Sequence, residues 1–183
     1  MENSIGFLCQ NSLSKEDARF KKLLNVNTII KRANQQDKVL ELVNRLSWRF
    51  PQEIQDDAVQ QFVNIAEDDD YSLLLTIGGK STWDNAVRII KCVGYPKNKQ
   101  ALPGIILLFQ DLNWPGTYEG IEILKEIDKK VFFPIIEAAI EEAFKCKDYM
   151  WLGGIKQFIE DAKICKNDFN DKDMHDLLAY ADW

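Results

Sequence analysis

Apolar side chains recur at intervals of three and four residues along most of the chain, the spacing that places them on one face of a helix. Val39, Val43 and Leu46 follow this spacing before Ser47 and Pro51 interrupt it. The same pattern predicts helices over residues 14–24, 34–46, 55–67, 71–77, 83–93, 101–111, 114–127, 131–145, 151–163 and 171–181. No stretch alternates as a half-buried strand does, so we expect an all-α fold of about ten helices in antiparallel pairs.

Polar residues and prolines mark where these helices begin. The expected N-caps are Ser81 or Thr82, Asn113, Asp148 or Tyr149, and Asn170 or Asp171. Pro103 and Pro115 are expected in the first turn of a helix, where the missing N–H costs nothing, and Pro134 is expected near the start of its helix.

Large side chains and prolines repeat in a fixed register. A tryptophan stands twenty residues before a proline, and a large apolar residue follows six residues later. The residues are Trp83, Pro103 and Phe109 in one unit and Trp114, Pro134 and Ile140 in the next. A looser unit precedes them, with Gln55 in the tryptophan position, and Trp151 opens another. Such a register predicts stacked helical hairpins that reuse one packing solution.

Length and composition are those of one domain. The chain has 183 residues and 46% hydrophobic content, enough for a single core or short solenoid. We divide it into N-terminal capping helices (1–50), repeats (51–165) and a C-terminal helix (166–183). No apolar run reaches the ~18 residues of a membrane span, and the first ten residues lack a basic signal-like region, so a cytoplasmic location is expected.

Charge is distributed unevenly along the chain. Residues 1–50 carry nine Lys or Arg and five Asp or Glu, whereas residues 51–183 carry 14 and 24. The acidic repeat region repels phosphate, so nucleic acid is not expected as its partner. Lys21, Lys22, Lys31 and Arg32 keep a nucleic-acid alternative open for the N-terminal segment.

The stretch Leu108–Pro115 resembles the L-Q-D-x-N-W-P signature of a bacterial family with HEAT-like repeats, domain-of-unknown-function family 5071. The resemblance covers about residues 70–165, and Trp151-Leu152 stands where that family opens another helix pair. It departs at Phe109, where the family more often has Trp or Leu. The resemblance implies a short HEAT-like α-α superhelix, with antiparallel hairpins stacked in a right-handed solenoid, and it implies no activity.

The residues of this motif also have a physical reading of their own. Asn113 can cap the following helix, and Trp114 offers an apolar face that can wedge between hairpins, as can Trp83 and Trp151. The alternative for these indoles is an exposed binding row. Asp111 is expected in the last turn of a helix, where the helix dipole disfavours a negative charge. An acid at this position is explained if it pairs with an indole N–H, accepts backbone N–H groups, or binds a partner.

The chain offers little for catalysis or metal binding. Its one histidine, His175, lies in a polar tail, and no cysteine pair has C-x-x-C spacing. The four cysteines, Cys9, Cys92, Cys146 and Cys165, are expected to be reduced and mostly buried. The sequences Gly78–Ser81 and Asp168–Asp173 lack the spacing of a phosphate loop and a calcium loop. We therefore predict no catalytic residue, no cofactor and no metal site.

Acidic rows along two predicted helices leave a surface as the candidate site. The partner-binding residues that we predict are Asp111, Glu119, Glu122, Glu126, Glu137 and Glu141. Their simpler role is to keep acidic faces solvated. The leading hypothesis is a non-enzymatic binding module for a basic protein, in its most concrete form an immunity-type protein that covers the active site of a cationic toxin domain. The alternatives are a helical-repeat nucleic-acid-processing protein or enzyme with an acidic catalytic residue, and a constitutive scaffold.

Overall fold

The computed structural model describes residues 32–182, and the predicted helix 14–24 and Cys9 lie outside this range. The chain divides into two units, residues 1–37 and 38–183, and apart from the first residues of the helix 32–45 the structure described below lies in the second. Residues 32–182 are helical or irregular throughout, with no strand among them, which confirms the all-α prediction.

Residues 32–45 are helical, so this helix begins earlier than the polar residues at 34 and 37 suggested. The α-helices that follow are α2 (Gln52–Ile65), α3 (Leu73–Thr76), α4 (Lys80–Val93), α5 (Leu102–Leu107), α6 (Thr117–Lys125), α7 (Lys129–Cys146), α8 (Tyr149–Asp161) and α9 (Lys172–Leu177). Short 3-10 helices are η1 (Asp68–Ser72), η2 (Lys99–Ala101), η3 (Leu108–Gln110), η4 (Lys166–Asp168) and η5 (Leu178–Tyr180).

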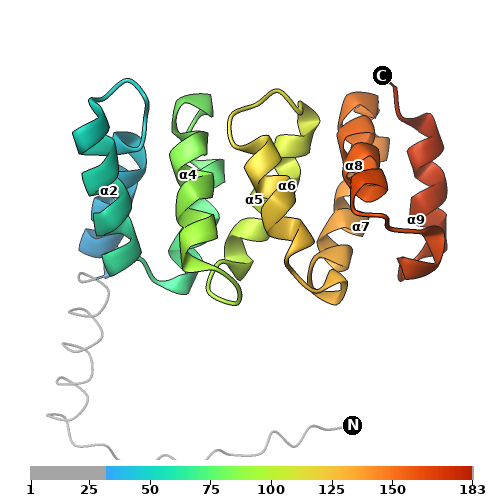
Figure 1. Ribbon diagram of the computed structural model, residues 1–183, viewed down its shortest axis with the longest axis horizontal. Helices are drawn as coiled ribbons and strands as arrows, with labels where there is room; N and C mark the ends of the chain where they lie inside the picture. Colours follow the sequence, from blue (N-terminus) through green and yellow to red (C-terminus); the bar gives the residue numbers. More distant parts are fainter. Residues whose placement is uncertain (1–31, 183) are drawn as a thin grey trace, which may run out of the picture. The chain divides into compact units, whose positions relative to one another are not determined.

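Within the unit 38–183, helices α2 to α7 and α9 each pack against an α-helix two places away in the α numbering. Helices α2, α4 and α6 contact one another in succession, and so do α3, α5, α7 and α9 (Figure 1). Helix α8 packs on α7 and on η3. Because consecutive helices run in opposite directions, alternate connections lie at the same end of the unit (Figure 1).

Phenylalanine rings form a continuous chain through the C-terminal half of the core. Phe109 of η3 lies 5.4 Å from Phe158 of α8, which lies 5.8 Å from Phe132 of α7. Phe132 stacks on Phe133 at 5.5 Å, and Phe133 meets the edge of Phe169 at 5.1 Å. All five side chains are buried, so these contacts join three elements and the segment before α9 into one apolar core.

The structure confirms some predicted helix starts and corrects others. Asp148 and Asp171 are N-caps whose carboxylates accept a backbone N–H from the first turn. Asn113 is not a cap, because α6 begins only at Thr117. The N-cap of α6 is Gly116, whose φ of 78° is a left-handed conformation that glycine adopts without strain. Helix α4 starts at Lys80 after Gly79, three residues before the predicted start.

The prolines of the repeat register do not occupy equivalent places. Pro103 is the second residue of α5, as predicted. Pro134 is the sixth residue of α7 and lies inside the helix, and Pro115 precedes α6 altogether. The first-turn prediction for Pro115 is therefore wrong, because α6 starts three residues later than its periodicity indicated. Pro134 lies two residues deeper in its helix than expected, because α7 starts at Lys129 rather than at Val131.

Three glycines let neighbouring elements approach more closely than a side chain would allow. A Cβ at Gly104 would lie 2.9 Å from the Cβ of Leu75, and one at Gly120 would lie 2.8 Å from the Cγ2 of Ile105. At Gly154, in α8, a Cβ would overlap the carbonyl oxygen of Phe109. The last contact is with backbone, which cannot rotate away, so the packing of α8 on η3 requires glycine at this position.

The cysteines within the described residues are placed differently from the prediction. Cys92, Cys146 and Cys165 are free thiols, as expected, but all three are exposed. They lie on polar faces or at ends of helices, where apolar neighbours in the sequence do not imply burial. None of the helices in residues 32–182 has the length and apolar character needed to cross a bilayer.

Replacing Gly154 by alanine is expected to lower the free energy of unfolding by about 1–3 kcal/mol, because the overlap with Phe109 exceeds the gain in helix propensity of ~1 kcal/mol. Gly79→Ala is the matched control, since Gly79 has φ −102° and no atom would lie within 4 Å of its Cβ. We expect the control to change stability by less than about 0.5 kcal/mol. Urea unfolding followed by circular dichroism measures both, and equal stability of the two variants would contradict the packing argument.

Candidate functional site

One end of the unit, which we call the connection edge, carries the connections that precede α2, α4, α6 and α8 (residues 46–51, 77–79, 111–116 and 147–148; Figure 1). Backbone hydrogen bonds link neighbouring parts of this edge. The N–H of Trp48 donates to the carbonyl of Ser81 over 2.9 Å, and the N–H of Asp182 donates to that of Tyr149 over 3.2 Å. The edge is thus a connected surface made from segments far apart in the sequence.

Large apolar side chains are exposed along this edge. Eight such residues are exposed among those described, and five of them lie in or next to the edge connections. A sixth, Tyr180, lies two residues before Asp182, whose N–H bonds to Tyr149 at the start of α8, and these six side chains have between 41% and 69% of their surface accessible. This apolar row consists of Trp48, Phe50, Ile77, Tyr118, Met150 and Tyr180. The other two, Tyr95 and Leu107, lie in the connection after α4 and on α5. An apolar row of this kind marks a contact surface more often than a scatter of single side chains does.

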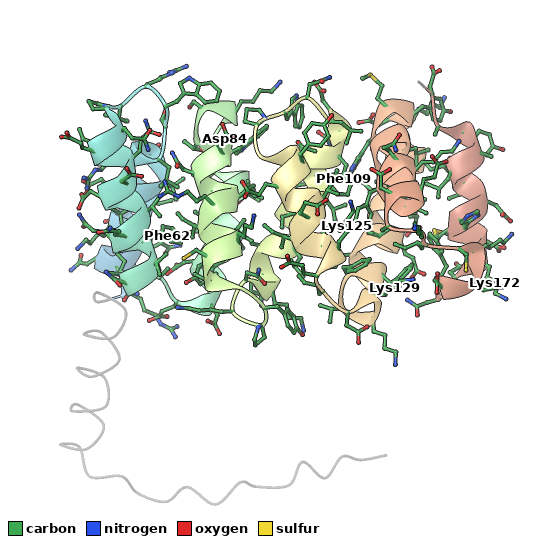
Figure 2. The ribbon with its side chains drawn as sticks, in the orientation of Figure 1. Phe62, Asp84, Phe109, Lys125, Lys129 and Lys172 are labelled. Atoms are coloured by element: carbon green, nitrogen blue, oxygen red, sulfur yellow. The ribbon has the colours of Figure 1, made fainter. Side chains whose placement is uncertain are left out.

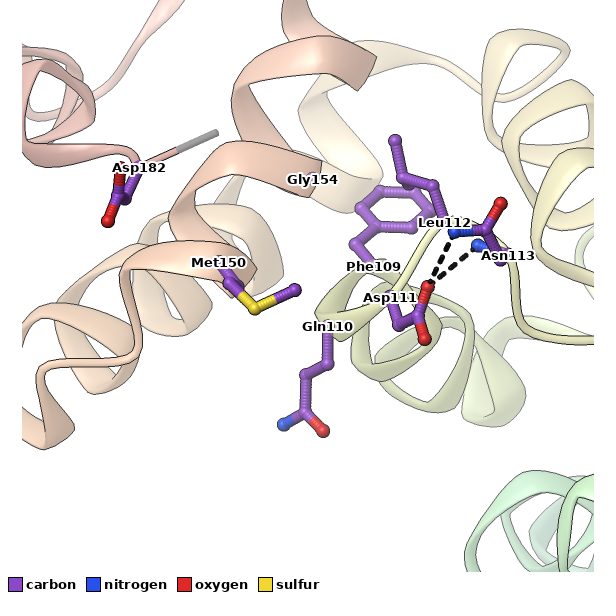
Figure 3. Close-up of a pocket in the computed structure, with 8 residues that line it drawn as sticks. All are labelled: Phe109, Gln110, Asp111, Leu112, Asn113, Met150, Gly154 and Asp182. Carbon is purple, nitrogen blue, oxygen red and sulfur yellow. Dashed lines mark hydrogen bonds between the residues drawn. The ribbon is translucent and has the colours of Figure 1, made fainter.

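A pocket of about 400 Å³ opens beside this row, between the connection after η3 and the first turns of α8 (Figure 3). Its lining residues are Phe109, Gln110, Asp111, Leu112, Asn113, Met150, Gly154 and Asp182. We call it the motif pocket because five of these residues belong to the Leu108–Pro115 motif. The bare Cα of Gly154 brings α8 against Phe109 and so sets how close its two walls lie.

Asp111 stabilises the connection that forms one wall of the pocket. Its Oδ1 accepts the backbone N–H of Asn113 over 2.9 Å and the side-chain amide of Asn113 over 3.2 Å (Figure 3). Acceptance of a backbone N–H was one of the three predicted reasons for an acid here, and it is confirmed. The Oδ2 atom has no partner among the described residues, so one oxygen remains available to a ligand.

The three tryptophans of the predicted register each contact a residue outside their own element. Trp83 of α4 and Trp114 have ring centroids 5.0 Å apart, and the ammonium of Lys80 lies 4.4 Å above the Trp114 ring. Trp151 of α8 is buried and donates its indole N–H to the carbonyl of Ile106 in α5 over 3.0 Å. These contacts agree with the predicted wedges, whereas the exposed aromatic residues of the edge are different ones.

On α6, the predicted acidic row has two members in ion pairs. Glu119, Glu122 and Glu126 are exposed, as the spacing predicted, but Glu119 pairs with Lys91 at 2.8 Å and Glu122 with Lys125 at 2.8 Å. The Glu119 hydrogen bond, with the charges of Glu126 and Glu122, raises the pKa of Lys91 above its ordinary value. This cluster carries a local balance of acids and lysines rather than a purely acidic face.

On α7, the two predicted residues have local partners. Glu137 accepts hydrogen bonds from the backbone N–H groups of Asn170 and Asp171 at 2.6 and 3.1 Å, which fixes the chain before α9. Glu141 pairs with Lys145 one turn away. Of the six predicted residues, Asp111 is therefore the one that lines the motif pocket, while Glu126 borders a separate hollow near Lys91.

Residues outside the predicted set complete the edge. The residues predicted from the sequence do not include Asp182, nor do they include Met150 or the other members of the apolar row. The exposure of two members of the row could have been predicted from the sequence. Ile77 and Tyr118 stand at helix ends, outside the periodic apolar stripe that faces the core. Asp182 had no such signal, since its place beside Met150 depends on how the C-terminal segment folds back onto α8.

The other candidates for chemistry have structural partners. His175 packs edge-on against Phe169 at 5.4 Å. Asp168 accepts the backbone N–H of Cys165 and pairs with Lys129, and these contacts hold its pKa below the ordinary value. Within residues 32–182, no group of three or more His, Cys, Asp or Glu side chains is arranged to hold a metal ion.

No protein-family model, curated protein or solved structure matches this chain. The features that bear on function are therefore the geometry of the connection edge and of the motif pocket.

The indoles of Trp151 and Trp83 offer a test of their different environments. The indole N–H of Trp151 is hydrogen-bonded, whereas the N–H of Trp83 is buried with no partner among the described residues. Replacing the indole by benzothiophene keeps the shape and removes the donor. At position 151 this is expected to lower the free energy of unfolding by about 1 kcal/mol, and at position 83 to leave it unchanged or raise it. Equal effects in chemical denaturation would refute the assignment.

Proposed function

We propose that this protein is a non-enzymatic binding module for a basic protein, and that the connection edge is the surface it uses. The main observation in its support is the apolar row, which continues into a pocket lined by Asp111 and Asp182. In its most concrete form the proposal is an immunity-type protein that covers the active site of a cationic toxin domain.

The proposed scaffold is a short right-handed solenoid of HEAT-like hairpins, as in the family with the L-Q-D-x-N-W-P signature. Contacts between alternate helices, α2 with α4 and α6, and α3 with α5, α7 and α9, support it. In such a scaffold every second connection reaches the same edge. A row of side chains, one or two from each connection, can then contact an extended partner surface.

The composition of the apolar row favours a protein partner. Tryptophan, tyrosine, phenylalanine and methionine are the residues enriched in the centres of protein interfaces. Each buries a large apolar area on contact, at about 25 cal/mol per Å² removed from water. Exposed side chains such as Tyr118, at 69%, and Met150, at 65%, leave most of that area available for binding.

Charge supports the choice of a basic partner. The chain carries a formal net charge of −6, and residues 51–183 hold most of its acids. Long-range attraction would steer a cationic protein toward this region and raise the association rate at low salt. Because Glu119, Glu122 and Glu141 are paired with lysines, the unpaired carboxylates around the motif pocket are better placed for direct contact.

A matched pair of variants tests the proposal. Ile77→Ser combined with Tyr118→Ser removes two members of the apolar row, while Leu107→Ser combined with Tyr95→Ser makes the same chemical changes elsewhere. All four side chains are exposed, so we expect both variants to fold. Purified wild-type protein and both variants are used to capture proteins from an extract of the source cells, and mass spectrometry quantifies what each retains.

We expect a protein of net positive charge that wild type and the control variant capture equally, with recovery lowered about tenfold or more by the edge variant. A loss of about 3 kcal/mol, within the range for two interface side chains, would suffice for that effect. Capture that both variants support equally would refute the connection edge as the binding surface. Circular dichroism of each variant excludes unfolding as the cause.

A further inference from the structure

We propose that the motif pocket binds a single arginine side chain of the partner. This inference rests on the proposed function and adds the chemistry of its central contact. The pocket combines an apolar floor with carboxylates at its rim, and its volume of about 400 Å³ lies within the range of small-ligand pockets. A guanidinium on an aliphatic stem has the same division between an apolar body and a charged end.

The floor of the pocket is apolar, which suits a weakly hydrated guanidinium. Phe109 is fully buried beneath it, and α8 packs on the Phe109 backbone at Gly154. Met150 lies at the mouth with 65% of its surface exposed, and in Figure 3 its thioether extends into the gap between α8 and the motif. A methionine side chain is flexible and polarisable, so it can close over an inserted group.

The rim supplies acceptors on two sides. Figure 3 places Asp182 on one side of Met150 and Asp111 with Gln110 on the other. The Oδ2 atom of Asp111 has no partner among the described residues, and Asp182 is exposed with only its backbone N–H tied to Tyr149. A guanidinium has five N–H donors in one plane and can donate to the free Asp111 oxygen and to neighbouring acceptors, whereas an ammonium is a compact charge that keeps its water.

Among the described residues that line the pocket, none is Lys, Arg or His, so an incoming cation meets no like charge from this part of the chain. One opposing effect comes from the amino end of α8, which carries about half a positive charge and lies near the mouth. Asp148 caps that end by accepting the N–H of Trp151 over 3.0 Å. Its full negative charge exceeds the dipole charge, so the field at the pocket still favours a cation.

The probe is N-acetyl-arginine amide, titrated at low salt into isotopically labelled full-length protein and followed by NMR. We expect shifts in the Met150 methyl and the Asp111 amide signals, with a dissociation constant on the order of 10 mM, as suits one isolated side chain. N-acetyl-citrulline amide has nearly the same shape without the charge and is expected not to bind. Binding of citrulline amide as tight as that of arginine amide, or no shift with arginine amide at 100 mM, would overturn the proposal.

Charge-neutral variants locate the contact. Asp111→Asn with Asp182→Asn is expected to weaken arginine-amide binding about tenfold, because charged hydrogen bonds are lost. Glu119→Gln with Glu126→Gln changes the net charge equally but lies outside the pocket, and should change binding less than twofold. Equal weakening by both double variants would show a general charge effect and overturn the pocket.

The outcomes of these experiments distinguish a failure of the proposed function from a failure of the arginine pocket. If arginine amide binds as expected but no basic protein depends on the apolar row, the proposed function is refuted and the pocket stands. If a basic partner is captured through the apolar row and Asp111→Asn with Asp182→Asn retains it fully, the pocket is refuted as the partner contact and the proposed function stands.

Discussion

The close approach of α8 to the preceding hairpin is the contact on which the C-terminal half of the structure depends. Gly154 brings the α8 backbone onto the Phe109 carbonyl, and the indole of Trp151 reaches across to the carbonyl of Ile106. Close packing of this kind leaves no room for adjustment, because backbone cannot change rotamer. The phenylalanine chain from Phe109 through Phe158 into α7 lies directly behind the same contact, so core and connection are positioned together.

This contact also creates the motif pocket. A larger residue in place of Gly154 would push α8 away from the motif and change the gap that Met150 borders. The hydrogen bonds from Asn113 to Asp111 hold the opposite wall in a turn rather than a helix. The residues that resemble a family signature therefore have a structural task first, and the exposed side of the same turn is what remains for a ligand.

Much of the fold could be predicted from the sequence, because apolar periodicity reflects burial directly. Helices α4 and α8 lie close to their predicted ranges, and the cap at Asp148 is a local effect of one side chain on one turn. The prediction failed at Asn113 and Pro115, where the chain forms a turn that ends at Gly116 in a left-handed conformation. Helix propensity at a helix boundary is a weak effect. Here Gly116 lies so close to Trp83 and Val87 of α4 that a residue with a Cβ would not fit, and this packing holds the chain in a turn.

The candidate site was harder to predict because it comes from packing rather than from spacing. Acidic residues at helical intervals, such as Glu119 and Glu122, indicate a shared face, but spacing says nothing of the lysines on a neighbouring helix or turn that neutralise them. The connection edge shows the opposite case. Ile77, Met150 and Tyr180 are far apart in sequence and carry no common motif, and they become one row because alternating helices return every second connection to the same end. Exposed side chains on these connections can change without disturbing the core, whereas Gly154 and the buried phenylalanine rings cannot, because close-packed atoms surround them.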